Sequence, residues 1–135
     1  MDPTTHVVQG MITTDVVGSC ATGLRIRLLN SSGDGPLMAF APDGTLYFAG
    51  QGCSPTVGTS AVPMIFRRSP AGVVDAIAGM NATGTVAEGA MSTRTIVDVQ
   101  SLAFDSVFGI VYGDGSLRRV RAIDPVALTV RTLVG

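Results

Sequence analysis

The chain has few side chains suited to nucleophilic or metal chemistry, and His6 is its only histidine. Any Ser-His-Asp, Cys-His or His-metal arrangement must therefore include His6, which falls in a predicted outer strand or chain end. No Gly-x-Ser-x-Gly or His-Glu-x-x-His motif occurs, and a chain without lysine cannot carry a phosphate-binding Gly-x-x-x-x-Gly-Lys loop. We expect no catalysis and no resident metal or other cofactor.

Polar residues in predicted loops are the remaining candidates for ligand contacts. The ten carboxylates do not form the Asp-x-Asp-x-Asp-Gly spacing of a calcium loop. Two Gly-Asp-Gly stretches, 33–35 and 113–115, predict tight turns between strands rather than phosphate loops. We take Asp34, Gln51 and Asp114 as candidate contacts for a peptide, glycan or small molecule, with hydrogen bonding to loop amides as the alternative role of the aspartates.

Composition limits the kinds of partner. Apolar residues make up 46% of the 135 residues and charged residues only 14%, where about 25% is usual. All nine basic residues are arginine, they are mostly scattered, and the net charge is −1. Such a chain lacks the basic surface that nucleic acid or an anionic membrane requires. The low charge indicates either that the surface consists largely of Gly, Ser, Thr and Ala or that part of it is covered by a partner.

No membrane span or leader is predicted. The longest charge-free stretch, 44–66, is interrupted by Gly and Pro, so it does not read as a transmembrane helix. The first residues, "MDPTTHVVQGM", lack the basic and apolar regions of a signal peptide. We therefore expect a cytoplasmic or virion-associated protein.

Short strands dominate the chain, and their order repeats. Runs such as "LRIRLL", "TLYFA" and "FGIVYG" are bounded by Gly, Pro, Asp or Asn, and no helical periodicity survives over eleven residues. A pattern of β-formers ending in Gly recurs about every sixty residues: "ITTDVVG", "VVDAIAG" and "LTVRTLVG". "PLMAFAPDGTLYFAG" also aligns with "QSLAFDSVFGIVYGD".

The repeat predicts an all-β fold of four-stranded antiparallel blades, the unit of a β-propeller. We assign residues 1–18 to a half blade that contributes an outer strand pair, 19–79 to blade one and 80–135 to blade two, all within one domain. Asp43-Gly44 predicts a two-residue hairpin turn with positive φ, and Ser69 to Gly72 predict a second turn. The innermost strands should be apolar on both faces, and the outer strands should hold their arginines in solvent.

Blade one resembles the NHL-repeat propellers, including those of Rhs-like and teneurin-like proteins. Asp43, Gly44, Leu46 and Tyr47 match the family's Asp-Gly turn and Leu-Tyr strand, and "MIFRRSPAGVVDAIAG" matches its Ile-Arg-Arg strand, Pro turn and terminal Ala-Gly. Blade two departs from the pattern, since "SVFG" replaces the Asp-Gly turn. The resemblance implies the propeller fold, but the family's varied ligands do not transfer.

Two and a half blades cannot surround an axis, because propellers need four to eight. We expect copies of the chain to complete a ring, with a fragment of a longer propeller or a compact β-sandwich as alternatives. Cys20 and Cys53 fall in connections on one face of blade one, where a disulfide is geometrically permitted, although free thiols are expected without a leader. A non-catalytic binding module is the predicted function, and a structural or decoration component of a virion or shell is the alternative.

Overall fold

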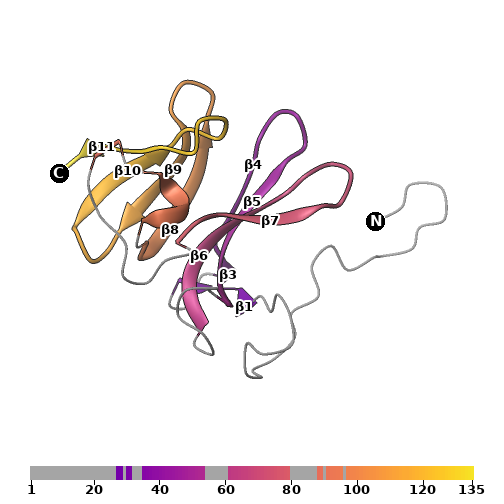
Figure 1. The fold of residues 1–135 in the computed structure, drawn as a ribbon, viewed down its shortest axis with the longest axis horizontal. Helices are drawn as coiled ribbons and strands as arrows, with labels where there is room; N and C mark the ends of the chain where they lie inside the picture. Colours follow the sequence, from indigo (N-terminus) through magenta and orange to yellow (C-terminus); the bar gives the residue numbers. More distant parts are fainter. Residues whose placement is uncertain are drawn as a thin grey trace.

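A computed structural model describes residues 27–28, 30–31, 35–53, 61–79, 88–89, 91–95 and 97–135. The described residues form two large antiparallel sheets and one two-stranded ladder, and no helix longer than a 3-10 turn (Figure 1). The first sheet contains β4 (Met38–Phe40), β5 (Leu46–Cys53), β6 (Ala61–Arg68) and β7 (Val74–Ala78). The second contains β8 (Val99–Asp105), β9 (Gly109–Asp114), β10 (Arg119–Ile123) and β11 (Val130–Val134).

Each sheet is a meander in which strands adjacent in sequence pair with one another. The long strand β5 pairs with β6 along its whole length, while its other edge is shared by β4 and by the short strand β1 (Arg27–Leu28). A separate two-stranded ladder joins β2 (Asn30–Ser31) to β3 (Gly35–Pro36). The 3-10 helix η2 (Ser92–Arg94) precedes the second sheet. The predicted all-β class and the two four-stranded antiparallel units are confirmed.

The hairpin turns of the first sheet each contain three residues, so the predicted two-residue turn at Asp43-Gly44 is wrong. The backbone amide of Gly44 donates to the Ala41 carbonyl, and the backbone amide of Ala41 donates to the Thr45 carbonyl. Within this turn, only Gly44 has a positive φ, +86°. Pro42 holds φ near −65° at the first corner, which selects a type I turn followed by a left-handed glycine.

The turn from Ser69 to Val73 repeats this geometry, with Pro70 at the first corner and Gly72 at φ +91°. The assignment of Pro and Gly roles in this second turn is thus confirmed. In the second sheet the left-handed residues of the corresponding turns are Gly109 and Leu128. The β10–β11 turn is one residue longer than the β6–β7 turn, since Ile123 pairs with Val130 whereas Arg68 pairs with Val74. The β8–β9 turn at "SVFG" has the same length as the β4–β5 turn, since Phe104 pairs with Ile110 as Phe40 pairs with Leu46, but its left-handed glycine lies one position later.

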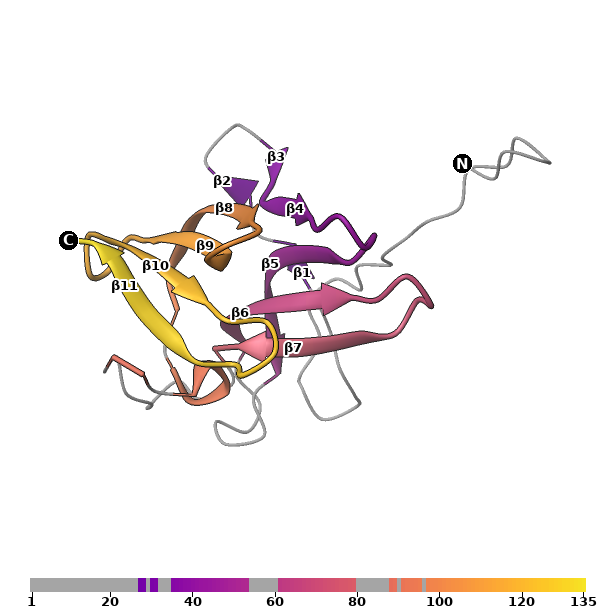
Figure 2. The same cartoon turned by 90° about the horizontal axis from the view of Figure 1, so that it is seen from above.

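A shared core joins the two sheets. The buried residues Tyr47, Ala49, Ile65 and Ile77 of the first sheet and Val99, Ile110, Tyr112, Ile123 and Val130 of the second belong to one cluster. Figure 2 shows the sheets side by side, with the turn between β10 and β11 directed toward β6 and β7. Two sheets that share a core in this way occur both as neighbouring propeller blades and within a sandwich.

The outer face of the first sheet is also apolar. Leu46, Phe48, Val62, Met64 and Phe66 form a second buried cluster, in which the Phe48 and Phe66 rings stack 5.3 Å apart. Met38 and Phe40 point to the same face, since they pair with Phe48 and Leu46, yet they are 43% and 61% exposed. Strand β4 is therefore apolar on both faces, as expected, and the outer face of this sheet is open at Met38 and Phe40 although Phe48 and Phe66 on the same face are fully buried.

Arg121 corrects the expectation that the arginines of the outer strands lie in solvent. Its side chain is fully buried because alternation along β10 directs it to the inner face, on the same side as Ile123. It lies opposite Tyr112 on β9, and its Nη2 atom lies 3.5 Å from Glu88 Oε1. Arg67, Arg119 and Arg131 are half-buried or exposed, in line with the expectation.

Some predictions fall on residues that the structure does not describe. The proposed half blade, 1–18, lies outside the described residues, as do His6, Cys20 and Asp34. Within the described ranges, no helix has the length and apolar character needed to cross a bilayer.

Candidate functional site

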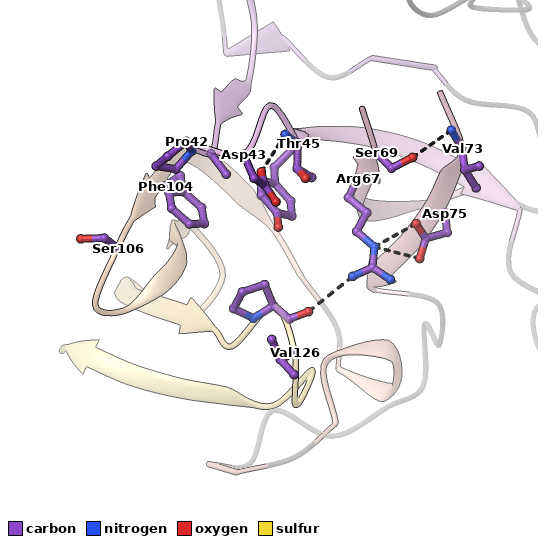
Figure 3. Close-up of a pocket in the computed structure, with 13 residues that line it drawn as sticks. Pro42, Asp43, Thr45, Arg67, Ser69, Val73, Asp75, Phe104, Ser106 and Val126 are labelled. Atoms are coloured by element: carbon purple, nitrogen blue, oxygen red, sulfur yellow. Dashed lines mark hydrogen bonds and ion pairs between the residues drawn. The ribbon is translucent and has the colours of Figure 1, made fainter. Parts of the chain in front are cut away.

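A cleft of about 870 Å³ opens between the two sheets, at the end where the hairpin turns lie. The β4–β5, β6–β7, β8–β9 and β10–β11 turns all contribute to its lining. Pro42 and Asp43 come from the β4–β5 turn and Ser69 from the β6–β7 turn, and Ser106 and Val126 come from the two turns of the second sheet, as Figure 3 shows. Concave sites between packed elements are the usual place for small ligands.

An ion pair on the first sheet forms one wall. Arg67 on β6 and Asp75 on β7 are paired by register, and Arg67 Nε donates to both Asp75 carboxylate oxygens at 2.9 and 3.1 Å. Hydrogen bonding to Asp75 raises the pKa of Arg67 above its ordinary value. Both side chains are about a third to a half exposed, so the pair contributes modestly to stability.

The same guanidinium also reaches the second sheet. Arg67 Nη1 donates to the Pro125 carbonyl in the β10–β11 turn at 3.4 Å (Figure 3). Arg67 is thereby held from both sides, by a carboxylate on its own sheet and by a backbone carbonyl on the other. This arrangement fixes the width of the cleft where the two sheets approach.

Two aromatic rings form the floor. Tyr47 on β5 and Phe104 on β8 stack with their centroids 5.8 Å apart and their planes only 6° from parallel. Tyr47 is 5% exposed, whereas Phe104 is half-buried and packs against the shared core. The rings belong to different sheets, so the floor exists only while the sheets are docked.

The Tyr47 hydroxyl is the polar group of this floor. Among the described residues no hydrogen bond to it is formed, although Tyr47 lines the cleft. Burial raises the pKa of Tyr47, and the nearby charges of Asp43 and Asp75 raise it further while Arg67 opposes them. The hydroxyl therefore lies within electrostatic range of all three charged groups of the cleft.

Asp43 supplies an ionised carboxylate at the rim. Its Oδ1 accepts a hydrogen bond from the Thr45 amide at 2.9 Å, and this bond lowers the pKa of Asp43 below its ordinary value. Such a bond is typical of an aspartate that closes a turn. Asp43 is exposed, so its charge faces both solvent and the mouth of the cleft.

Of the residues chosen from the sequence as candidate contacts, the two that the structure describes, Gln51 and Asp114, do not line this cleft. Gln51 lies in β5, where its backbone pairs with Pro63 and Arg27. Asp114 is buried, 3% exposed, and its Oδ1 accepts from the Leu117 amide at 3.1 Å, closing the turn after β9. This is the alternative role considered for it. Cys53 ends β5, and the expectation of free thiols at Cys20 and Cys53, with a disulfide as the alternative, stays a prediction.

The sequence did contain a signal for the observed wall. A charged residue just before a Ser-Pro-Ala-Gly turn and an opposite charge just after it must meet across a hairpin, as Arg67 and Asp75 do. Phe104 could not have been found this way, because its partner Tyr47 lies on the other sheet.

The cleft holds carboxylates, hydroxyls and one guanidinium, and no group of three metal-ligating side chains occurs among the described residues. Comparison with family models, with curated proteins and with solved structures finds no match to this chain. The cleft's own geometry is therefore the basis for assigning a function.

Proposed function

We propose that the protein is a non-catalytic binding module, built from β-propeller-type blades akin to NHL repeats, whose copies associate into a ring. The cleft between the sheets is the observation that carries the binding role. Its polar groups suit binding rather than catalysis. Arg67 donates hydrogen bonds to Asp75 and to the Pro125 carbonyl, and Asp43 accepts one that closes a turn. Neither arrangement supplies a nucleophile beside a base.

The outer faces of the two sheets support association of copies. Met38 and Phe40 leave apolar surface open on the first sheet. On the second sheet, Ala103 and Val134 are exposed and Val111 is half-buried, on the face away from the shared core. In a ring, the open part of the first sheet's outer face around Met38 and Phe40 in one copy would pack on the outer face of the second sheet in the next. This is a head-to-tail contact that closes by rotation.

The mass of the full chain in solution tests the ring, by native mass spectrometry or light scattering. We expect one small closed number of subunits. Phe40→Glu and Ala103→Glu each place a charge on a different outer face, and both should shift the species toward monomer. Val107→Glu is the matched control, because Val107 is 76% exposed at a hairpin turn and on neither outer face.

Three results would count against the ring. A wild-type chain that stays monomeric at high concentration, open-ended aggregates of many sizes, or equal effects of the glutamate variants and the Val107→Glu control would each contradict it. A stable monomer would favour the sandwich, and open-ended aggregation would favour a piece of a longer propeller.

A further inference from the structure

We propose that the cleft between the sheets binds an organic cation, namely an alkylammonium or guanidinium group of the kind that ends a lysine or arginine side chain. The inference names the ligand class of the binding module proposed above and therefore rests on it. Three observations carry it: the balance of charge, the aromatic floor and the Tyr47 hydroxyl at the cleft.

The charges that line the cleft sum to −1. Asp43 and Asp75 are acidic, and Arg67 is the single basic residue of the lining. Arg67 and Asp75 neutralise each other through their short contacts, which leaves the carboxylate of Asp43 in excess. A cation is attracted to this mouth, whereas an anion would meet Asp43 before it reached the engaged guanidinium.

The aromatic floor suits a cation as well. The Phe104 ring is half-buried beside Tyr47 and lines the cleft, and a cation over the face of a ring is attracted by its π electrons. The alkyl stem of such a ligand would lie along the apolar side chains of Pro42, Val73 and Val126, as the stems of lysine and arginine do on apolar surface.

The Tyr47 hydroxyl provides the directional contact. Tyr47 is more than nine-tenths buried, and within the described chain its hydroxyl forms no hydrogen bond. The hydroxyl oxygen itself is not among the fully buried unpaired polar atoms of the described chain, so it is open to the cleft and can accept from an ammonium or guanidinium N–H. Asp43 and Asp75 both act electrostatically on this hydroxyl, so a cation bound to it would also be near both carboxylates.

The probes for the test are n-butylammonium and n-butylguanidinium, with butyramide and butyrate as neutral and anionic controls of similar length. Binding to the full-length protein is followed by NMR through the ring signals of Tyr47 and Phe104. We expect saturable shifts with the two cations, with a dissociation constant on the order of 1 mM because the probes are small. Added salt should weaken the binding.

Two variants and a matched control locate the site. Asp43→Asn keeps an oxygen for the Thr45 amide while removing the charge, and it should weaken cation binding about two- to five-fold. Tyr47→Phe keeps the ring and should weaken binding about ten-fold. Asp105→Asn is the control: Asp105 closes a hairpin turn in the same way but does not line the cleft, so its affinity should equal that of the wild type.

The proposal is overturned if butyramide or butyrate shifts the same signals as strongly as the cations. It is equally overturned if the cations shift no cleft signal, or if Asp43→Asn and Tyr47→Phe bind as the wild type does. These outcomes are independent of subunit number. A ring that binds no cation would sink this inference alone, and a monomer that binds the cations would sink the ring.

Discussion

Tyr47 and Phe104 stack across the two sheets, with their ring centroids 5.8 Å apart and their planes nearly parallel. Each ring is contributed by a different four-stranded unit, so this contact exists only when the units are docked. Arg67 and Pro125 make a second contact of the same kind at 3.4 Å. The cleft is thus a product of docking rather than of either sheet alone.

Phe104→Ala should destabilise the fold by about 2 to 4 kcal/mol, because it removes a large ring that packs on the shared core. Urea unfolding measured by circular dichroism gives the value. Phe108→Ala is the matched control. Phe108 is 41% exposed and its ring centroid lies 5.2 Å from the Arg131 guanidinium, so its loss should cost less than about 1 kcal/mol. Equal costs would contradict the role given to Phe104.

Tyr112 should make the protein lose stability at alkaline pH. Burial raises the pKa of Tyr112 from 10.0 to about 12, although nearby Arg121 opposes the shift. The unfolded chain therefore releases this proton first, so stability is complete below pH 10 and falls between pH 10 and about 12. The shift corresponds to about 2 to 3 kcal/mol.

Phenolate absorbance during an alkaline titration checks this, since the chain has only two tyrosines. Tyr112→Phe should remove the later-titrating phenol and much of the alkaline loss of stability. Tyr47→Phe should leave the later step in place. A wild-type protein in which both phenols titrate at the ordinary value while still folded would contradict the burial of Tyr112.

Asp105 should support the fold more strongly when it is ionised than when it is protonated. Its Oδ1 accepts from the amides of Val107 and Phe108 at 2.8 and 2.9 Å, and these bonds lower its pKa from the ordinary 3.8. The stabilisation is therefore present above pH 3.8 and is lost as the pH falls through the lower, folded-state value. Asp105→Ala should lower the thermal midpoint at neutral pH and reduce the steepness of acid unfolding.

The control for this turn is Asp105→Asn, which keeps an acceptor but removes the titration. Its neutral-pH midpoint should lie closer to that of the wild type than to that of Asp105→Ala. If both substitutions lower the midpoint equally, the charge rather than the hydrogen bonding supports the turn.

Gly109→Ala should be far more damaging than Gly44→Ala, although both glycines have φ near +85°. Each alanine meets the left-handed backbone cost of about 1 kcal/mol. At Gly109 a Cβ would also collide with the Ile123 carbonyl, whereas at Gly44 the nearest atom is Pro70 Cγ at 3.6 Å. We expect a loss above about 3 kcal/mol at Gly109, measured by urea unfolding; similar losses at both sites would contradict the close approach.

Sequence patterns predicted what depends on neighbours along the chain. The alternation in "TLYFA" and "FGIVYG", and the glycines that follow, were sufficient for the strands and for their hairpin order. The turn at Asp43 was predicted one residue too short because Pro42 was not counted as its first corner. Local signals of this kind predict each sheet but not how the two sheets pack on each other.

The candidate site depends on contacts that the sequence pattern does not encode. Arg121 was expected in solvent because a charged residue in an outer strand usually is, yet strand alternation directs it into the core beside Tyr112. Asp114 was selected for its Gly-Asp-Gly context, but its carboxylate closes a turn. Tyr47 and Phe104 become a pair only through docking, which no spacing within one hairpin encodes.

The meander order of the strands from β4 to β11 has a consequence for synthesis. Each four-stranded unit pairs only sequence neighbours among these strands, so the first can be completed on the ribosome before the second has emerged. Until then the apolar inner face around Ile65 and Ile77 has no counterpart. A nascent chain that pauses near residue 80 would be the species most in need of a chaperone.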